Sequence, residues 1–214
     1  MASTESRGER WSATEPGKAL GRVAAMLLLV VAAQLWPPAA AGAAGAPTLG
    51  GSFELVDHNG VMRTAEDFRG SYSLIYFGFT HCPDLCPTSL AKMSRALDSL
   101  AERAPAKAAR IVPIFITVDP ERDTVDVMKD YVANFHRRLV GLTGTAEQVD
   151  RAAKNYGAFY APVPVDGGDY VVDHSGFILL MGPTNEYLTH FESDVEAADL
   201  VKELDRRVEE QPQP

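Results

Sequence analysis

Two continuous apolar stretches place the strongest constraint on how this chain can fold. They are YSLIYFGF, residues 72–79, and RIVPIFITV, residues 110–118. A strand covered on both faces reads as a continuous apolar run, whereas a half-exposed strand alternates. Between the two stretches, apolar residues recur at helical spacing, at Leu90, Met93, Leu97 and Leu100. Strand, helix and strand in this order predict parallel strands at the centre of an α/β sheet.

Two hairpins are expected to flank this centre. Residues 52–68 predict the first, whose turn contains Asn59 and Gly60 and so allows the positive φ of a tight turn. Residues 170–181 and 186–192 predict the second, across the turn sequence GPTN. Pro113 weakens the prediction for the second apolar stretch, because proline removes a backbone donor from the strand ladder.

Three further helices are predicted from apolar spacing and capping residues. Their expected caps are Asp123 or Thr124 for residues 125–135, Thr145 with Gln148 for a helix through Tyr156, and Ser193 with Glu196 for the last helix. A short apolar strand is expected at 139–144. The order of these elements fits a thioredoxin-like, peroxiredoxin-related α/β sandwich, with a central mostly parallel sheet, an N-terminal hairpin and flanking helices.

The first residues differ in composition from the rest of the chain. Basic residues precede an apolar run at 23–33, and residues 37–47 contain only Pro, Ala and Gly. This pattern predicts an export signal or a single membrane anchor plus a flexible tether over residues 1–45, followed by one domain over 46–214. The uninterrupted apolar run is short for a spanning helix, which needs about 20 residues. Either interpretation places the domain outside the cytoplasm.

The charge balance argues against nucleic acid as a partner. The formal net charge is −9, with 20 basic and 29 acidic residues. An acidic domain without a basic stripe is a poor binder of nucleic acid and of anionic lipid. We therefore expect contact with a membrane only through the N-terminal segment.

The chemistry of the chain is concentrated in FTHCPDLCPTSL, which holds its only two cysteines, Cys82 and Cys86. Pro87 suits the first position of a helix, so Cys86 is expected at the N-cap. A thiol there faces free backbone N–H groups, which favour the thiolate. Thiolates are both nucleophiles and metal ligands, so a disulfide, a redox pair and a metal site all remain open.

A metal site needs a further ligand, and His174 in VVDHSGF is the candidate among five histidines. It lies at a break between two apolar runs, and Asp173 is a candidate to orient its ring. Two thiolates and one imidazole form a soft set, which suits copper better than a four-coordinate zinc site. Of the other histidines, His58 is expected to be solvated and His136 structural, and His190 has no visible partner. His81 adjoins Cys82 and is a candidate to tune its thiol, although neighbouring side chains tend to diverge.

Three segments of the chain resemble the signature blocks of the SCO/SenC family of copper-binding cytochrome c oxidase assembly proteins. They are YFGFTHCPDLCPTSL, ITVDPERDT and YVVDHSGFILLMGP. The resemblance runs from about residue 51 to 208 and implies a thioredoxin-like fold. It also implies that Cys82, Cys86 and His174 bind copper(I) or copper(II), with the VDPERDT block beside them. The implied partners are oxidase subunit II, another copper chaperone and, through the N-terminal segment, the membrane.

Three classes of function are consistent with these observations. The first is a copper metallochaperone, at the periplasmic face of a bacterial inner membrane or at the mitochondrial inner membrane. The second is a thiol–disulfide oxidoreductase that keeps the subunit II cysteines reduced, with Cys82 and Cys86 as its redox pair. The third is a structural domain with an incidental disulfide. A copper chaperone fits better than a catalyst, because the cysteine spacing is wider than in disulfide oxidoreductases.

Overall fold

The structure is a computed structural model that describes residues 49–209. The apolar run at 23–33 and the tether lie outside these residues. No helix within 49–209 is both long and apolar enough to span a bilayer. The described residues belong to one compact unit.

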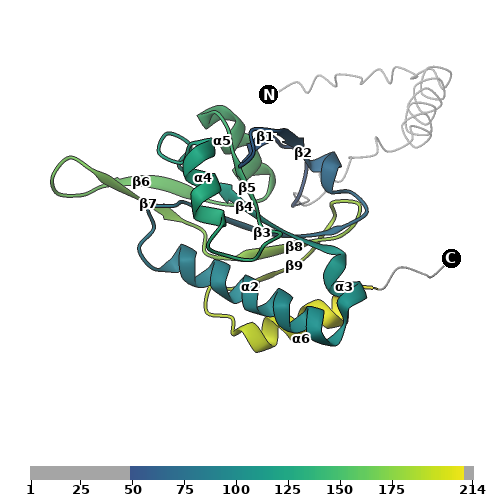
Figure 1. Ribbon diagram of the computed structural model, residues 1–214. Coiled ribbons are helices and arrows are strands. Elements are labelled where there is room, and N and C mark those ends of the chain that lie inside the picture. The colour runs from purple at the N-terminus through teal and green to yellow at the C-terminus, as the bar shows by residue number, and fades with distance from the viewer. Residues whose placement is uncertain (1–48, 210–214) are drawn as a thin grey trace, which may run out of the picture. The chain divides into compact units, whose positions relative to one another are not determined.

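A seven-stranded mixed sheet forms the middle layer, in the order β2-β1-β5-β4-β3-β8-β9 (Figure 1). Its central pairs, β3 with β4 and β4 with β5, are parallel, and the flanking pairs are antiparallel. The strands are β1 Glu54–Asp57, β2 Met62–Thr64, β3 Tyr72–Gly78, β4 Ile111–Thr117, β5 Val140–Thr143, β8 Ile178–Met181 and β9 Tyr187–Phe191. The two apolar stretches are therefore neighbouring parallel strands, as predicted.

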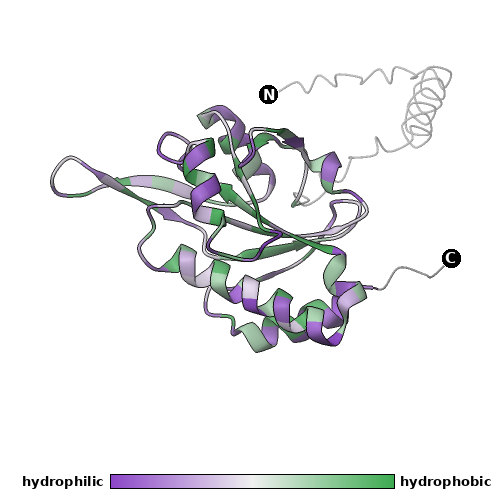
Figure 2. Cartoon of the chain, viewed as in Figure 1, coloured by the Kyte–Doolittle hydropathy of each residue, from purple (hydrophilic) through white to green (hydrophobic). Residues whose placement is uncertain are grey.

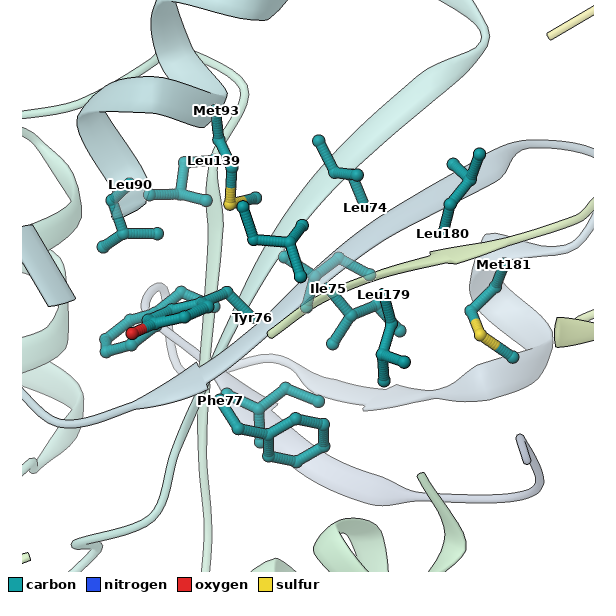
Figure 3. Packing of buried hydrophobic residues seen from close by; sticks show 14 of the residues in the cluster. Leu74, Ile75, Tyr76, Phe77, Leu90, Met93, Leu139, Leu179, Leu180 and Met181 are labelled. Carbon is teal, nitrogen blue, oxygen red and sulfur yellow. The ribbon is translucent and has the colours of Figure 1, made fainter. Parts of the chain in front are cut away.

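Helices cover both faces of this sheet, so the predicted α/β sandwich is confirmed. Figure 1 shows α2, α3 and α6 on one face and α4 and α5 on the other. The helices are η1 Ala65–Phe68, α2 Leu85–Arg103, α3 Pro105–Ala109, α4 Val125–Val132, α5 Ala146–Asn155 and α6 Ala197–Arg207. Every residue of β3 is buried. Figure 3 shows its successive side chains Tyr76 and Phe77 pointing to opposite faces.

Pro113 is accommodated because the neighbouring strand is short at that end. It pairs with Leu74 of β3, but β5 pairs with β4 only at Ile114, Phe115 and Ile116. Proline is tolerated where no partner strand needs its missing N–H.

The predicted late hairpin is partly wrong. Residues 170–181 do not form one strand: β7 Tyr170–His174 leaves the sheet and pairs with β6 Tyr160–Pro164 in a separate two-stranded ribbon. Only β8 and β9 form the expected hairpin. The β6 strand was missed because Pro162 and Pro164 argue against a strand in a sheet interior. Here β6 pairs with β7 alone, so its other edge is free and tolerates both prolines. The ribbon projects from the body beside the start of α2 (Figure 1).

Two of the expected helix caps are confirmed and one is wrong. Thr145 and Gln148 form the capping box of α5, and the Thr124 side chain accepts a hydrogen bond from Val127 N–H in α4. The last helix begins later than expected, because its N-cap is Glu196 rather than Ser193.

The packing of α2 on the sheet gives a test of the core. Leu97 is fully buried on this helix. Replacing a buried leucine with alanine removes apolar contacts and leaves a cavity, so L97A should lower the free energy of unfolding by about 2–5 kcal/mol. Urea denaturation followed by circular dichroism measures the change. An unchanged denaturation midpoint would contradict this packing.

Candidate metal centre

The two cysteines lie in the connection between β3 and α2 and in the first turn of α2. β3 ends at Gly78, and α2 begins at Leu85. Cys82 lies in the connecting loop and is partly exposed, whereas Cys86 lies in the first turn of α2 and is fully buried. Both are free thiols. Groups beyond the carboxyl ends of parallel strands are well placed to meet a ligand.

His174, at the end of β7, lies beside the two cysteines and is the third candidate metal ligand. Its Nε2 lies 3.3 Å from Cys86 Sγ. The donor atoms of Cys82, Cys86 and His174 all lie within 4.8 Å of one another. The structure thus brings together the three residues that the sequence singled out. Among residues 49–209 no other group of His, Cys, Asp and Glu meets the same criterion.

The expected N-cap position of Cys86 is wrong, although the underlying physics is present. Asp84 is the N-cap residue, and Pro87 is the third residue of α2 rather than the first. All of the first turn lacks helical partners for its N–H groups, so proline marks that turn without fixing the position. The sulfur that faces the helix terminus is that of Cys82, which accepts a hydrogen bond from Cys86 N–H at 3.4 Å.

This arrangement shifts the pKa values of the two thiols in opposite directions. Hydrogen bonds from the Cys86 thiol and from backbone N–H groups of Cys86 and Asp84 lower the pKa of Cys82 to about 4. The pKa of Cys86 is raised, because its thiol donates to the ionised Cys82 and because it is buried. One thiolate is therefore present at neutral pH, and Cys86 keeps its proton until a metal or base takes it.

The imidazole of His174 is oriented by backbone and aromatic contacts. Its Nδ1 lies 3.0 Å from the carbonyl oxygen of Ser175, which accepts the Nδ1 proton and leaves Nε2 free as a ligand. The ring packs edge-on against Phe79 and Tyr76, at centroid distances of 5.7 and 6.1 Å. The expected orienting residue, Asp173, is exposed instead, because adjacent strand residues point to opposite faces.

Two residues of β3 shape the space around Cys86. The Tyr76 hydroxyl donates toward Cys86 Sγ at 3.8 Å, and burial raises the pKa of Tyr76, so it stays protonated. A Cβ atom on Gly78 would lie 2.6 Å from the same sulfur. Neither role was inferred from the sequence. The available signal was a tyrosine and a glycine near the end of an otherwise aliphatic strand.

A buried carboxylate holds the loop that leads to Cys82. Asp123 is fully buried and accepts hydrogen bonds from Thr80 N–H at 3.0 Å, Thr80 Oγ1 at 2.6 Å and Thr117 Oγ1 at 2.6 Å. A buried carboxylate is stable only when such donors surround it. Asp123 was expected as a helix cap; it instead ties the cysteine loop to the end of β4.

Arg122 joins the β6–β7 ribbon to the loop before α4. Its guanidinium forms an ion pair with Asp119, lies 3.8 Å from the ring centroid of Tyr170 and donates to the Tyr170 carbonyl at 3.0 Å. Tyr170 in turn donates its hydroxyl to Asp119 at 2.8 Å. Because His174 lies on the same strand as Tyr170, this contact restrains the third donor.

Among the remaining histidines a structural contact is confirmed for His136, whereas His58, expected to be solvated, is half-buried. His58 accepts a hydrogen bond from Gly141 N–H, His136 accepts one from Arg138 N–H, and His81 is exposed beside Thr80. His190, which had no visible partner in the sequence, contacts the Tyr187 hydroxyl at 2.6 Å.

Comparison with known proteins shows which family the chain belongs to. A sequence profile of the SCO1/SenC family matches residues 41–209. The chain belongs to the SCO1/SenC family. Among curated family members, the human mitochondrial SCO1 homologue is 46% identical over 148 residues, which are 69% of this chain and 48% of that protein. The Rickettsia prowazekii SCO2-like protein is 42% identical over 72% of this chain and 74% of its own length. The chain thus spans only about half the length of the human family member.

Solved structures of the family share the fold. Arabidopsis thaliana ScoI with copper bound is 37% identical, with a TM-score of 0.70 over 74% of this chain and 96% of that structure. BsSco, described as a member of the Sco family of cytochrome c oxidase assembly proteins, has a TM-score of 0.59 over 75% of this chain and 93% of that structure. At 23% identity, its likeness supports the fold alone.

The lowered pKa of Cys82 predicts selective alkylation. Iodoacetamide at pH 6 should modify Cys82 well before Cys86, because a pKa of about 4 leaves Cys82 ionised there. The Cys82 rate should stay level from pH 8 to 6 and fall only as the pH approaches 4. Fragmentation mass spectrometry locates the adduct, and the denatured chain is the control. Equal rates at both cysteines in the folded chain would contradict the assignment.

The close approach of Gly78 to Cys86 predicts a coupled pair. G78A should destabilise the protein by about 1–3 kcal/mol, because the added methyl group collides with the sulfur. The same change in a C86A background should cost less, since the sulfur is gone. Urea denaturation of the four variants of this double-mutant cycle measures the coupling. Additive effects would show that the contact is unimportant.

Proposed function

We propose that this protein is a copper chaperone that carries one copper ion on Cys82, Cys86 and His174. The observation that carries the proposal is the convergence of two sulfurs and one imidazole nitrogen within 4.8 Å. The copper-binding domain is proposed to extend over residues 46–214.

The donor set favours copper over zinc. Structural zinc sites use four protein ligands, whereas three soft donors satisfy copper(I) and also suit copper(II). A Sco protein that is 37% identical to this chain has been solved with copper bound. Cys82 is ionised before the metal arrives, whereas the Cys86 thiol must give up its proton to bind.

The two sulfurs differ in access, and this difference suits a carrier. Cys86 is fully buried, whereas Cys82 is partly exposed at the edge of the loop. An acceptor thiolate can therefore reach a copper ion on the Cys82 side while Cys86 and His174 still hold it. In transfer by ligand exchange, acceptor thiolates replace the donor's ligands one at a time, so the copper ion is never released free. This requires one ligand that the acceptor can reach from solvent.

The proposed role is assembly of the dinuclear copper centre of cytochrome c oxidase, with oxidase subunit II as acceptor and another copper chaperone as donor. Membership of the SCO1/SenC family supports this role. Relatives include mitochondrial and bacterial proteins, so we propose the periplasmic face of a bacterial inner membrane or the mitochondrial inner membrane. Residues 1–45 are proposed to direct export or to anchor the domain.

One observation favours a second function, reduction of the subunit II cysteines. A partly exposed thiolate with a pKa of about 4 and a second thiol beside it are the parts of a dithiol reductase. Cys82 thiolate would attack the substrate disulfide, and Cys86 would then displace the second substrate thiol. One disulfide in this protein forms as the substrate disulfide is reduced, so two electrons balance.

Copper titration of the reduced protein under anaerobic conditions tests the first function. We expect about one copper per chain, and little for the Cys82–Cys86 disulfide form, which has no thiolate ligands. C82S, C86S and H174A should each weaken binding by at least ~10-fold, or about 1.4 kcal/mol. Competition with a chelator of known affinity measures the change.

H190A is the matched control, since His190 belongs to no cluster of candidate metal ligands in the described residues. Undiminished affinity of H174A would refute the third ligand. Rapid reduction of oxidised subunit II by the copper-free protein, with no loss of that activity in H174A, would favour the reductase.

A further inference from the structure

The β6–β7 ribbon carries apolar side chains into solvent. Phe159 is 60% exposed, Val163 and Val165 are each 42% exposed, and Val171 is 41% exposed. Figure 2 shows apolar colour along both strands of the projecting ribbon. We call these four residues the ribbon face. Large apolar side chains that gather on one exposed element mark an interaction site more often than scattered ones do.

Strand geometry puts the four residues on one side of the ribbon. Val163 and Val171 are paired across the strands, and Val165 lies two residues beyond Val163. Phe159, just before β6, continues the same alternation and exchanges hydrogen bonds with Ser175. The opposite side, with Tyr170 and the buried Val172, turns toward the loop between β4 and α4.

A partner can bind to the side chains on the ribbon face but cannot readily add a strand to the free edge of β6. Hydrogen bonds from Ser175 to Phe159 and from Val165 to Asp169 show that odd-numbered residues bond across the strands. Pro162 and Pro164 therefore occupy the outward positions of β6, where they remove the N–H donors that an added strand would need. A partner is left to pack on side chains.

The ribbon face lies on the side of the ribbon opposite to the His174 side chain, and its Phe159 end is the part that adjoins the candidate metal centre. Ser175, opposite Phe159, follows His174 directly and accepts its Nδ1 proton. The Phe79 ring contacts His174 from the cysteine loop, at a centroid distance of 5.7 Å. A protein that reaches Cys82 with its own thiolates and extends along the ribbon will also cover this apolar surface.

The charge around the ribbon face indicates which kind of partner can bind there. No Lys or Arg occurs between Lys154 and Lys202. Asp166, Asp169 and Asp173 are exposed on the ribbon, and Arg122 beside it is already paired with Asp119 and Asp169. Two copies meeting through this face would oppose like charges, and an anionic membrane would repel it. A partner with an apolar patch and a basic rim is complementary.

We propose that the ribbon face is the docking surface for the copper acceptor, a protein whose thiolate-bearing rim is apolar and flanked by Lys or Arg. This proposal rests on the proposed chaperone function and deepens it. Docking here would place the acceptor along the strand that carries His174, so that the site and the ribbon recognise one partner together.

The soluble copper domain of the cognate oxidase subunit II is the probe. Calorimetry with the copper-loaded full chain should show binding that weakens as salt increases, because the rim is charged. The V163S/V171S double variant should weaken binding and slow copper transfer by at least ~10-fold, with copper affinity unchanged. D166K should weaken binding less, and mainly at low salt. V61S/M62S is the matched control, since Val61 and Met62 are 47% and 48% exposed on the first hairpin.

Several outcomes would overturn the proposal. These are wild-type binding and transfer by V163S/V171S, an equal loss in V61S/M62S, or no complex between wild-type protein and subunit II. A dimer in sedimentation equilibrium that V163S/V171S abolishes would assign the face to a second copy instead. Binding of the wild-type ribbon face to phosphatidylglycerol vesicles would assign it to the membrane.

Copper titration of the same samples separates failure of docking from failure of the metal site. If copper binds normally but docking is unaffected by the ribbon variants, only the docking surface is wrong. If copper does not bind to Cys82, Cys86 and His174, the chaperone function itself fails.

Discussion

The approach of one imidazole to one sulfur is the contact on which the candidate metal centre depends. Cys86 and His174 are 88 residues apart in the sequence, yet Nε2 and Sγ lie 3.3 Å apart. The sulfur is fixed by the first turn of α2 against β3, and the ring is fixed by the end of β7 against Phe79 and Tyr76. The three donors therefore come together only because the β6–β7 ribbon packs against the end of β3 and the start of α2.

The supports of this contact are polar groups inside the protein. Asp123 holds the cysteine loop through Thr80, and Arg122 holds the ribbon through Tyr170. Both residues come from the segment that follows β4. One short stretch therefore restrains both the cysteine loop and the ribbon that carries His174. Buried networks of this kind give a unique arrangement, because each member loses a partner if another moves.

The sequence was sufficient for the fold and the donor set, and insufficient for their details. Continuous apolar runs identified β3 and β4, because burial on both faces leaves a clear signal. The family resemblance supplied His174 as a partner of the cysteines, which spacing alone left open. The ribbon was missed because Pro162 and Pro164 disfavour an interior strand, and only the three-dimensional structure shows that both lie at an edge.

The details of the helix start were also beyond the sequence. Pro87 marked the first turn of α2 but not its first residue, since any of the first three positions tolerates proline. Because of this shift of two residues, the sulfur that accepts a hydrogen bond from the first turn of α2 is that of Cys82 and not, as expected, that of Cys86. The orienting groups Ser175 and Gly78 could not be inferred, because a backbone carbonyl and an absent side chain leave no pattern in a single sequence.

The contact between Gly78 and Cys86 has a consequence for how the two cysteines can change over evolution. The Cys86 sulfur fills a gap between β3 and α2 as any small core side chain would. Under the proposed function, selection for a well-packed interior and selection for metal binding act on the same atom. Cys82 is partly exposed and contributes little to the packing. If selection for metal binding were lost, substitutions would therefore accumulate at Cys82 long before the fold was affected.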